Sequence, residues 1–277
     1  MSSPSVYCWI ANPEHRPVAY EDAASRRVGL ELEVEGYHSD GSWNESGHWD
    51  VKNDDSLRNS GRELVFVRPL NRQYTEVALA EAREVLSSCV ISHRTSVHVH
   101  VDVRDLDRLQ LKALLVYYAM VESQLYKKAG KHRYSNIYCP GISDTNGVLE
   151  SLTSLYRALS RGVGSSTRSY IERHCKYTGL NLRPMIELGS VEFRMHEGTT
   201  DTQRILEWVI CLQNLVQYAH DNPLGSGAKE VILTARTEGF AATARKILGV
   251  AVDLSDDRYE VFFEQNLLNA LEIIGDC

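Results

Sequence analysis

The sequence has little of what marks fibrous, disordered or membrane proteins. Its 277 residues include only seven prolines and 18 glycines, too few for a collagen-like, linker-rich or low-complexity protein. The apolar runs are only a few residues long, as at residues 114–116 and 261–263, far short of the ~20 residues of a membrane-spanning helix. Residues 1–7 lack the basic and apolar segments of a secretory signal. These absences predict a globular protein in the cytoplasm, without a membrane partner.

Closely spaced cysteines and an excess of basic residues are also absent. The six cysteines are widely separated and form no C-x-x-C motif, so in a cytoplasmic protein we expect free thiols. Thirty Lys and Arg residues stand against 37 Asp and Glu, for a formal net charge of −7. Broad nucleic-acid binding needs a basic surface, so this balance argues against a nucleic-acid partner. A chain of this length can bury a large core without disulfides or a structural metal.

The pattern of apolar residues predicts strands and helices in mixed order. Alternating apolar residues predict strands at 28–36, 63–67, 96–103 and 191–196. Helical spacing predicts helices at 74–88, 109–129, 148–159, 229–248 and 256–274, and one more that Asp201 caps. Single strands between helices, followed by helices alone, predict an α+β fold with a mainly antiparallel sheet covered by helices on one side.

Polar and glycine-containing segments predict loops and the boundary between a main domain and a C-terminal extension. Residues 36–53 are expected to form a long loop or a hairpin excursion. Residues 162–168 are expected to form a loop, either a plain surface loop or one over a pocket. We divide the chain into a domain at 1–222 and a helical extension at 223–277 that packs on it, with residues 225–227 as the hinge.

Three of the predicted strands have polar faces of an unusual composition. Side chains two residues apart lie on the same face of a strand. These faces carry Glu31, Glu33 and Glu35 on the first strand, Ser96, His98, His100 and Asp102 on the next, and Glu192, Arg194 and His196 on the last. The opposite faces carry Val, Leu, Phe and Met, and are expected to pack on helices.

The polar faces have two interpretations. One is the ordinary solvated side of a half-exposed sheet. The other, which we favour, is a metal site, because clustered carboxylates repel one another unless a cation lies among them. Several carboxylates suit Mg²⁺ or Mn²⁺ better than zinc, since no Cys/His spacing typical of a tetrahedral site is present. Arg194 beside these carboxylates indicates a bound phosphate or carboxylate.

The order and spacing of these motifs resemble the amidoligase family of the carboxylate–amine ligases, a group that includes glutamine synthetase and glutamate–cysteine ligase. The resemblance extends over residues 28–208 and rests on the segments 29–33, 51–57, 61–63, 98–102, 192–194 and 198–199. It implies a curved, mainly antiparallel sheet that forms a glutamine synthetase-like funnel, with helices on its outer face. It also implies that ATP phosphorylates a carboxylate and that an amine attacks the acyl phosphate to form an amide.

The resemblance implies roles for individual residues and for cofactors. The cofactors are ATP and Mg²⁺ or Mn²⁺, and the substrates are a small-molecule or peptide carboxylate and an amine. The implied metal ligands are Glu31, Glu33, Glu63, His98 and Glu192. His100 and Asn181 are implied on the nucleotide side, and Arg194 on the transferring phosphate. Glu63 and Arg133, an arginine after a helix, complete the implied catalytic set.

The sequence departs from the family at one position and leaves other functions open. The family usually has glycine where this chain has Asp55, so either Asp54 or Asp55 could face the site. The His-x-His-x-Asp pattern also suits a metal-dependent hydrolase, although Val103 stands where one such class has a further histidine. A non-catalytic binding or assembly protein is the third possibility. The charged cluster argues against it, because an unused cluster of charges is costly to keep in a partly buried site.

Overall fold

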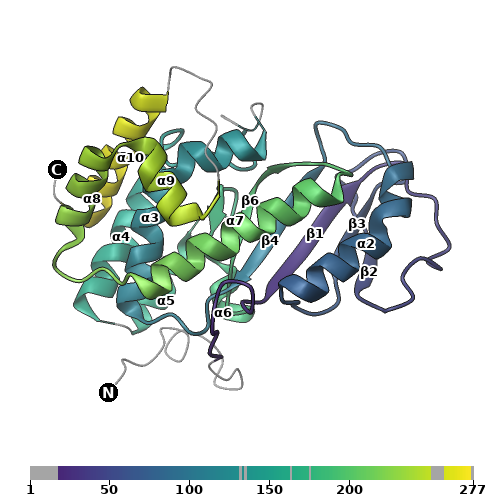
Figure 1. Ribbon diagram of the computed structural model, residues 1–277, viewed down its shortest axis with the longest axis horizontal. Coiled ribbons are helices and arrows are strands. Elements are labelled where there is room, and N and C mark those ends of the chain that lie inside the picture. Colours follow the sequence, from purple (N-terminus) through teal and green to yellow (C-terminus); the bar gives the residue numbers. More distant parts are fainter. Residues whose placement is uncertain are drawn as a thin grey trace.

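The computed structural model describes residues 18–130, 133, 136–162, 164–174, 176–250 and 259–275. Within them, an open antiparallel sheet and its covering helices lie toward one end of the molecule, and a larger group of helices lies toward the other (Figure 1). The mixed helix and sheet architecture and the antiparallel sheet were both predicted, and both are confirmed. None of the described helices combines the length and apolar character needed to cross a membrane.

The sheet has six strands in the order β2-β3-β1-β4-β6-β5. The strands are β1 (Val28–Val34), β2 (Trp49–Asn53), β3 (Arg62–Phe66), β4 (Ser96–Asp102), β5 (Leu180–Asn181) and β6 (Ser190–Glu197). All neighbouring strands are antiparallel. Strands β1 and β4 lie at the centre, so the two strands with the Glu-x-Glu and His-x-His patterns are direct neighbours.

Nine helices are assigned among the described residues. They are α2 (Arg72–Ser88), α3 (Arg108–Ala129), α4 (Asn146–Arg161), α5 (Ser165–Arg173), α6 (Pro184–Glu187), α7 (Thr202–Asp221), α8 (Ala228–Glu238), α9 (Phe240–Leu248) and α10 (Tyr259–Ile274). The cap predicted at Asp201 is confirmed: its carboxylate accepts hydrogen bonds from the backbone N–H groups of Gln203 and Arg204.

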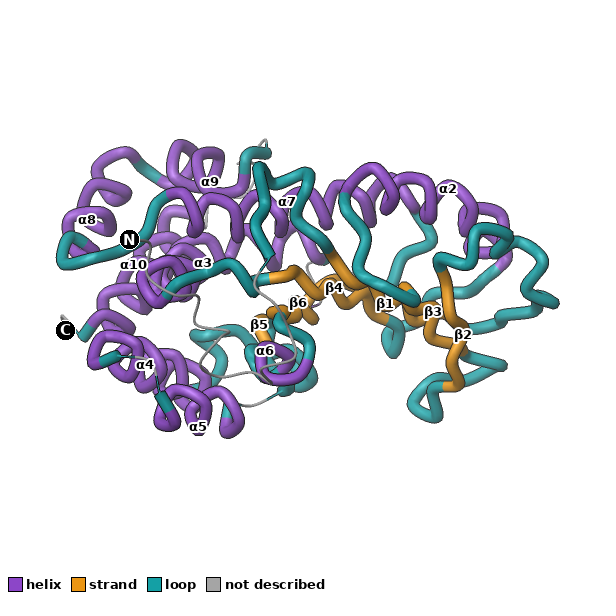
Figure 2. The backbone as a smooth tube through the Cα atoms, turned by 90° about the horizontal axis from the view of Figure 1, so that it is seen from below, coloured by secondary structure: helices purple, strands orange, loops and turns teal. Residues whose placement is uncertain are grey.

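One face of the sheet is covered by helices and the other is not. Helices α2 and α7 lie along the same side of the strands (Figure 2). The apolar strand residues, such as Leu30, Leu32 and Phe193, belong to the buried core. The indole of Trp49 donates a hydrogen bond to the carbonyl of Ala78, which ties β2 to α2. Since alternate side chains point to opposite faces, the polar residues of β1 and β4 lie on the side away from α2 and α7.

The structure corrects three expectations about local structure. The last residues of the predicted loop at 36–53 form β2, which pairs with β3. The predicted loop at 162–168 contains the start of α5, which packs against α4 and α6. The single helix expected at 229–248 is two helices, because Gly239 has φ 84° and ends α8. That value of φ lies in the left-handed region and cannot continue a right-handed helix.

The C-terminal helices pack on the long buried helix of the first part of the chain. In α10, the amide of Asn266 donates to the hydroxyl of Ser123 in α3 at 2.8 Å. The division at residue 222 stays a prediction. Cys89, Cys139 and Cys211 are free thiols, as expected. Cys8, Cys175 and Cys277 lie outside the described residues, as do residues 1–7.

Candidate active site

The uncovered face of the sheet brings together the acidic and histidine side chains of four strands. The antiparallel register places Glu31 opposite His98, Glu33 opposite Glu63, and His100 opposite Glu192. Side chains at directly opposite positions lie about 5 Å apart at their Cβ atoms. The strand pairing therefore builds the cluster from residues far apart in the sequence.

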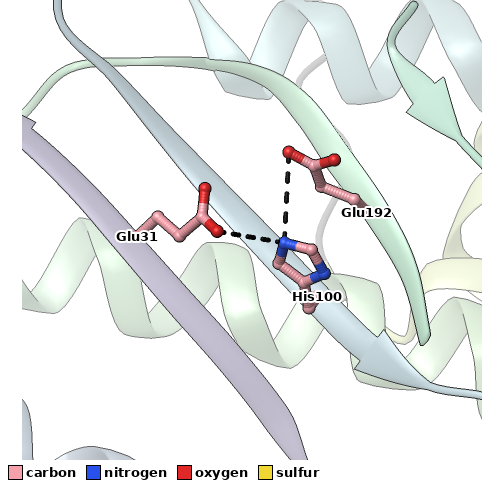
Figure 3. Close-up of side chains that lie close together, drawn as sticks. All are labelled: Glu31, His100 and Glu192. Carbon is pink, nitrogen blue, oxygen red and sulfur yellow. Dashed lines mark ion pairs between the residues drawn. The ribbon is translucent and has the colours of Figure 1, made fainter. Parts of the chain in front are cut away.

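Glu31 lies at the centre of this cluster. Its Oε2 atom is 3.1 Å from Nδ1 of His98, and its Oε1 atom is 3.3 Å from Nε2 of His100. An oxygen of Glu192 lies 4.0 Å from the same Nε2 atom, so both carboxylates approach one nitrogen of His100 (Figure 3). The two oxygens of Glu31 therefore face two different histidines.

Two groups of side chains have the geometry to hold a metal ion. One is Glu31, Glu63 and His98, and the other is Glu31, His100 and Glu192. Within each group the potential ligand atoms lie within 4.8 Å of one another. Carboxylate and imidazole atoms are suitable ligands for Mg²⁺ or Mn²⁺. Glu31 belongs to both groups.

Burial and neighbouring charges act on the protonation of the cluster. Burial, together with the like charges of Glu31 and Glu33, raises the pKa of Glu63 to about 7. Burial would also raise the pKa of Glu31, but hydrogen bonds from His100 and His98 outweigh it and hold that pKa well below its usual range. Burial opposes the charged form of His100, yet its hydrogen bond to Glu31 and the charge of Glu192 raise its pKa. The carboxylates and imidazoles of the cluster therefore act strongly on one another's protonation.

Glu33 and Glu192 are each oriented by a neutral partner. The hydroxyl of Ser96 donates to Glu33 at 2.5 Å and lies 2.8 Å from Nε2 of His98. The amide of Asn181 donates to Oε2 of Glu192 at 2.6 Å. Such hydrogen bonds fix the direction of a ligating carboxylate.

Arg194 and Arg133 differ in what their guanidinium groups can still bind. Arg194 pairs with Glu192 through one Nη, while its buried Nε atom has no hydrogen-bond partner among the described residues. The guanidinium of Arg133 donates from Nε to the carbonyl of Met195 at 3.0 Å and from Nη2 to that of Arg194 at 3.1 Å. Arg133 therefore lines the Glu33 cleft, at the place where the resemblance implied an arginine after a helix. Its guanidinium also anchors the backbone of β6.

Two cavities lie against the uncovered face, and Glu31 lines both. The first, which we call the Glu33 cleft, has a volume of about 440 Å³. It is lined by Glu31, Glu33, Asp54, Ser56, Glu63, His93, Arg94, Ser96, His98, Arg133, Asn136, Tyr138, Lys176, Tyr177 and Arg194. The second, which we call the His100 pocket, has a volume of about 450 Å³. It is lined by Arg27, Gly29, Leu30, Glu31, Val65, Phe66, Val67, Arg68, Pro69, His100, Asp102, Arg104, Glu187, Leu188 and Ser190.

His196 does not share the polar face with Glu192 and Arg194, contrary to expectation. The register between β4 and β6 shifts by one residue between Val97 and Val99, so His196 lies opposite Val97. A one-residue shift moves a side chain to the other face of a sheet. His196 is buried against Trp208 of α7, with ring centroids 5.2 Å apart. Burial lowers its pKa to about 3, so the imidazole is neutral at pH 7.

Of the two aspartates that the sequence leaves open, only Asp54 is among the described residues that line the Glu33 cleft. Asp54 lines the Glu33 cleft, and its carboxylate also accepts a hydrogen bond from the backbone of Ser56. The left-handed backbone in this loop falls at Asn59 and Ser60, with φ of 51° and 57°. Asp55 therefore does not adopt the left-handed backbone for which glycine is favoured.

Several lining residues were not predicted from the sequence. The Glu33 cleft includes Arg94, Lys176 and two tyrosines from loops, and the His100 pocket includes Arg27 and Arg68. These residues follow no periodic pattern. The only available signal was basic or aromatic character in a loop next to a predicted strand, which is common on protein surfaces.

Comparison with known proteins supports the resemblance. A search of curated proteins finds no match to the chain. A family model described as "putative amidoligase enzyme" matches residues 17–216, which include every described strand and both candidate metal groups. A family of this kind indicates an enzyme that forms amide bonds. The match covers most of the sequence, and the chain belongs to the amidoligase family.

Proposed function

We propose that the protein is an ATP-dependent carboxylate–amine ligase that works through an acyl phosphate. The observation that carries the proposal is the pair of candidate metal groups that share Glu31 beside Arg194. Phosphoryl transfer from ATP needs cations that neutralise the phosphates, and a guanidinium suits the charge on the transferring group. Bound Mg²⁺ or Mn²⁺ would supply that neutralisation and align the reacting oxygens.

The His100 pocket suits a nucleotide. Val67 and Leu188 are each 60% exposed and lie on its wall with Pro69, where an adenine ring could pack. Exposed Arg27 and Arg68 lie in the same pocket and can pair with phosphate oxygens. Since His100 and Glu31 line this pocket and belong to a candidate metal group, the terminal phosphate would point toward Glu31 and Arg194.

The Glu33 cleft, on the other side of Glu31, suits the carboxylate and amine substrates. In the first step a carboxylate oxygen attacks the γ-phosphorus of ATP, and ADP leaves. In the second step the amine nitrogen attacks the acyl carbon, the bond from that carbon to the phosphate oxygen breaks, and the nitrogen loses a proton. The products are an amide, ADP and inorganic phosphate.

The chain's own residues would have separate tasks in these steps. Arg194, oriented by Glu192, offers its remaining N–H donors to the transferring phosphoryl group. Asn181 holds Glu192 in place, and Ser96 holds Glu33. Under this proposal the sheet is one wall of a glutamine synthetase-like funnel, entered by ATP through the His100 pocket and by the other substrates through the Glu33 cleft.

The test is ADP formation with Mg²⁺ and a panel of carboxylates and amines, with mass spectrometry to detect the amide. We expect turnover that depends on one carboxylate–amine pair. Arg194→Ala and Glu33→Ala should each lower turnover by ~100-fold or more, while Arg236→Ala, an exposed arginine on α8, should not. Circular dichroism and thermal melting would confirm that the variants fold. Wild-type turnover in either site variant would contradict the assignment.

A metal-dependent hydrolase is the second candidate, because both histidines of the His-x-His pattern point to carboxylates. It predicts metal-dependent cleavage of amide or ester probes without nucleotide. Cleavage in the absence of ATP, together with no nucleotide binding, would favour it over the ligase.

A further inference from the structure

The mouth of the Glu33 cleft carries exposed aromatic side chains. Tyr138 and Tyr177 line the cleft and are 62% and 42% exposed. The rings of Tyr138 and Tyr177 meet edge to face, with centroids 6.2 Å apart. Residues of this kind grouped at the edge of a cleft mark a contact surface for a ligand that extends beyond it. We call these two tyrosines the rim.

The rim is attached firmly to the sheet. The N–H of Gly179 donates to the carbonyl of Pro140, and the N–H of Arg194 in β6 donates to the carbonyl of Gly179, both at 3.0 Å. The buried carboxylate of Glu122 accepts the N–H of Ile142 at 2.9 Å, just beyond the loop that carries Tyr138. The exposed side chains therefore stand on backbone of defined position, so binding to them costs little ordering of the protein.

Two cations, Arg94 and Lys176, lie at the same mouth. Within the described part of the chain, neither Arg94 nor Lys176 forms an ion pair, and both are exposed. Arg94 donates to the carbonyl of Ser56 at 3.3 Å, and the ammonium of Lys176 lies 4.7 Å from the ring centroid of Tyr177. The acidic floor with Glu31 and Glu63 lies deeper, so a negatively charged ligand meets these cations first. The mouth is complementary to a ligand that is both anionic and apolar.

The size of the cleft agrees with a ligand larger than one amino acid. Its volume of about 440 Å³ is in the range of sites for drug-sized molecules, and the rim adds surface outside that volume. A polypeptide would place one carboxylate at Arg194 and its neighbouring residues at the mouth.

We propose, on the basis of the ligase function above, that the carboxylate substrate of the Glu33 cleft is an acidic polypeptide. One carboxylate, from an Asp or Glu side chain or from the C-terminus, reaches Arg194 and is phosphorylated. A neighbouring acidic side chain lies between Arg94 and Lys176, and an adjacent apolar side chain packs on Tyr138 and Tyr177. The amide then forms on the polypeptide.

Binding can be measured without turnover. A short fluorescein-labelled peptide of glutamate and leucine would be titrated with the full chain and followed by anisotropy, next to a matched peptide of glutamine and leucine. The charge-reversed variant R94E/K176E should bind the acidic peptide ~10-fold or more weakly. The matched variant R83E/K229E, which reverses two exposed cations on α2 and α8, should bind it like the wild type. Tyr138→Ala should weaken binding of the leucine-containing peptide more than that of an all-glutamate peptide.

The outcomes separate this inference from the ligase function. Equal binding of the acidic and glutamine peptides, equal binding by both double variants, or no binding at millimolar protein would overturn the inference. ADP and amide formation with free amino acids but never with peptides would also overturn it, and the ligase function would stand. Peptide binding by the expected residues without any nucleotide turnover would support the docking surface and contradict the ligase function.

Discussion

Glu33 and Glu63 lie directly opposite each other on the neighbouring strands β1 and β3. Like charges at such positions destabilise a sheet. Burial and this repulsion raise the pKa of Glu63 to about 7, so the pair is strained whenever both carboxylates are ionised. A divalent cation bound among Glu31, Glu63 and His98 would relieve the strain, which connects stability to metal binding.

This relationship predicts opposite effects of Glu63→Gln with and without metal. In EDTA the variant should be more stable than the wild type by about 0.5–1 kcal/mol, because the cross-strand repulsion is removed. In excess Mg²⁺ or Mn²⁺ the wild type should gain melting temperature and the variant should gain less. Thermal melting under both conditions measures the effect. A metal-dependent rise of equal size in the two proteins would show that Glu63 holds no cation.

Asn181 is predicted to act on metal binding through Glu192. Its amide fixes one oxygen of Glu192 at 2.6 Å, so Asn181→Ala should leave that carboxylate free to turn away. Loss of such a supporting hydrogen bond typically costs ~10–100-fold in metal affinity. Mn²⁺ binding followed by calorimetry would measure it. Asn214→Ala, which removes an amide bonded to the Leu248 carbonyl far from the site, is the control and should leave the affinity unchanged.

His196 is predicted to make stability depend on pH. Burial lowers its pKa to about 3 in the folded protein, against about 6.5 for an exposed imidazole. Between about pH 3 and pH 6.5 the unfolded chain therefore binds one more proton than the folded protein. The stabilisation is complete above pH 6.5 and is lost as pH falls from 6.5 toward 3, by about 1.4 kcal/mol per pH unit. In urea unfolding at pH 7 and pH 5, His196→Gln should lose less stability than the wild type. Parallel losses in the two proteins would contradict the prediction.

Gly179 is predicted to tolerate no side chain. A Cβ atom there would lie 2.6 Å and 2.8 Å from the hydroxyls of Tyr126 and Tyr118, both buried. Gly179→Ala should therefore destabilise the protein by about 1–3 kcal/mol through overpacking. Gly147→Ala, in the first turn of α4 where a Cβ would meet nothing within 4 Å, should be neutral or stabilising. Denaturant unfolding of both variants would test the contrast.

The alternation of side chains predicted the polar face well but not its last residue. Glu31 and Glu33, like His98 and His100, lie together because a regular strand alternates strictly. His196 breaks the rule because of the register shift between β4 and β6. No single strand shows such a shift, since it depends on how two strands pair.

Local residue chemistry also predicted the helix cap at Asp201 but not the break between α8 and α9. A side-chain cap acts within a few residues and is visible in the sequence. Gly239 stands in a helical pattern that is otherwise continuous, and glycine is tolerated inside helices. Its left-handed backbone is set by how Phe240 and the rest of α9 pack into the core.

The sequence by itself determined which strands carry acidic, histidine and arginine side chains and, His196 apart, which face of each strand they occupy, because these depend on residue type and on a two-residue period. The tertiary structure decided which of them meet. Strand order placed Glu31 between His98 and His100, and placed Glu33 against Glu63. Loops distant in the sequence brought Arg94, Lys176 and Tyr138 to one cleft. Contacts of this kind arise from strand pairing and chain packing over long sequence separations, which no local pattern records.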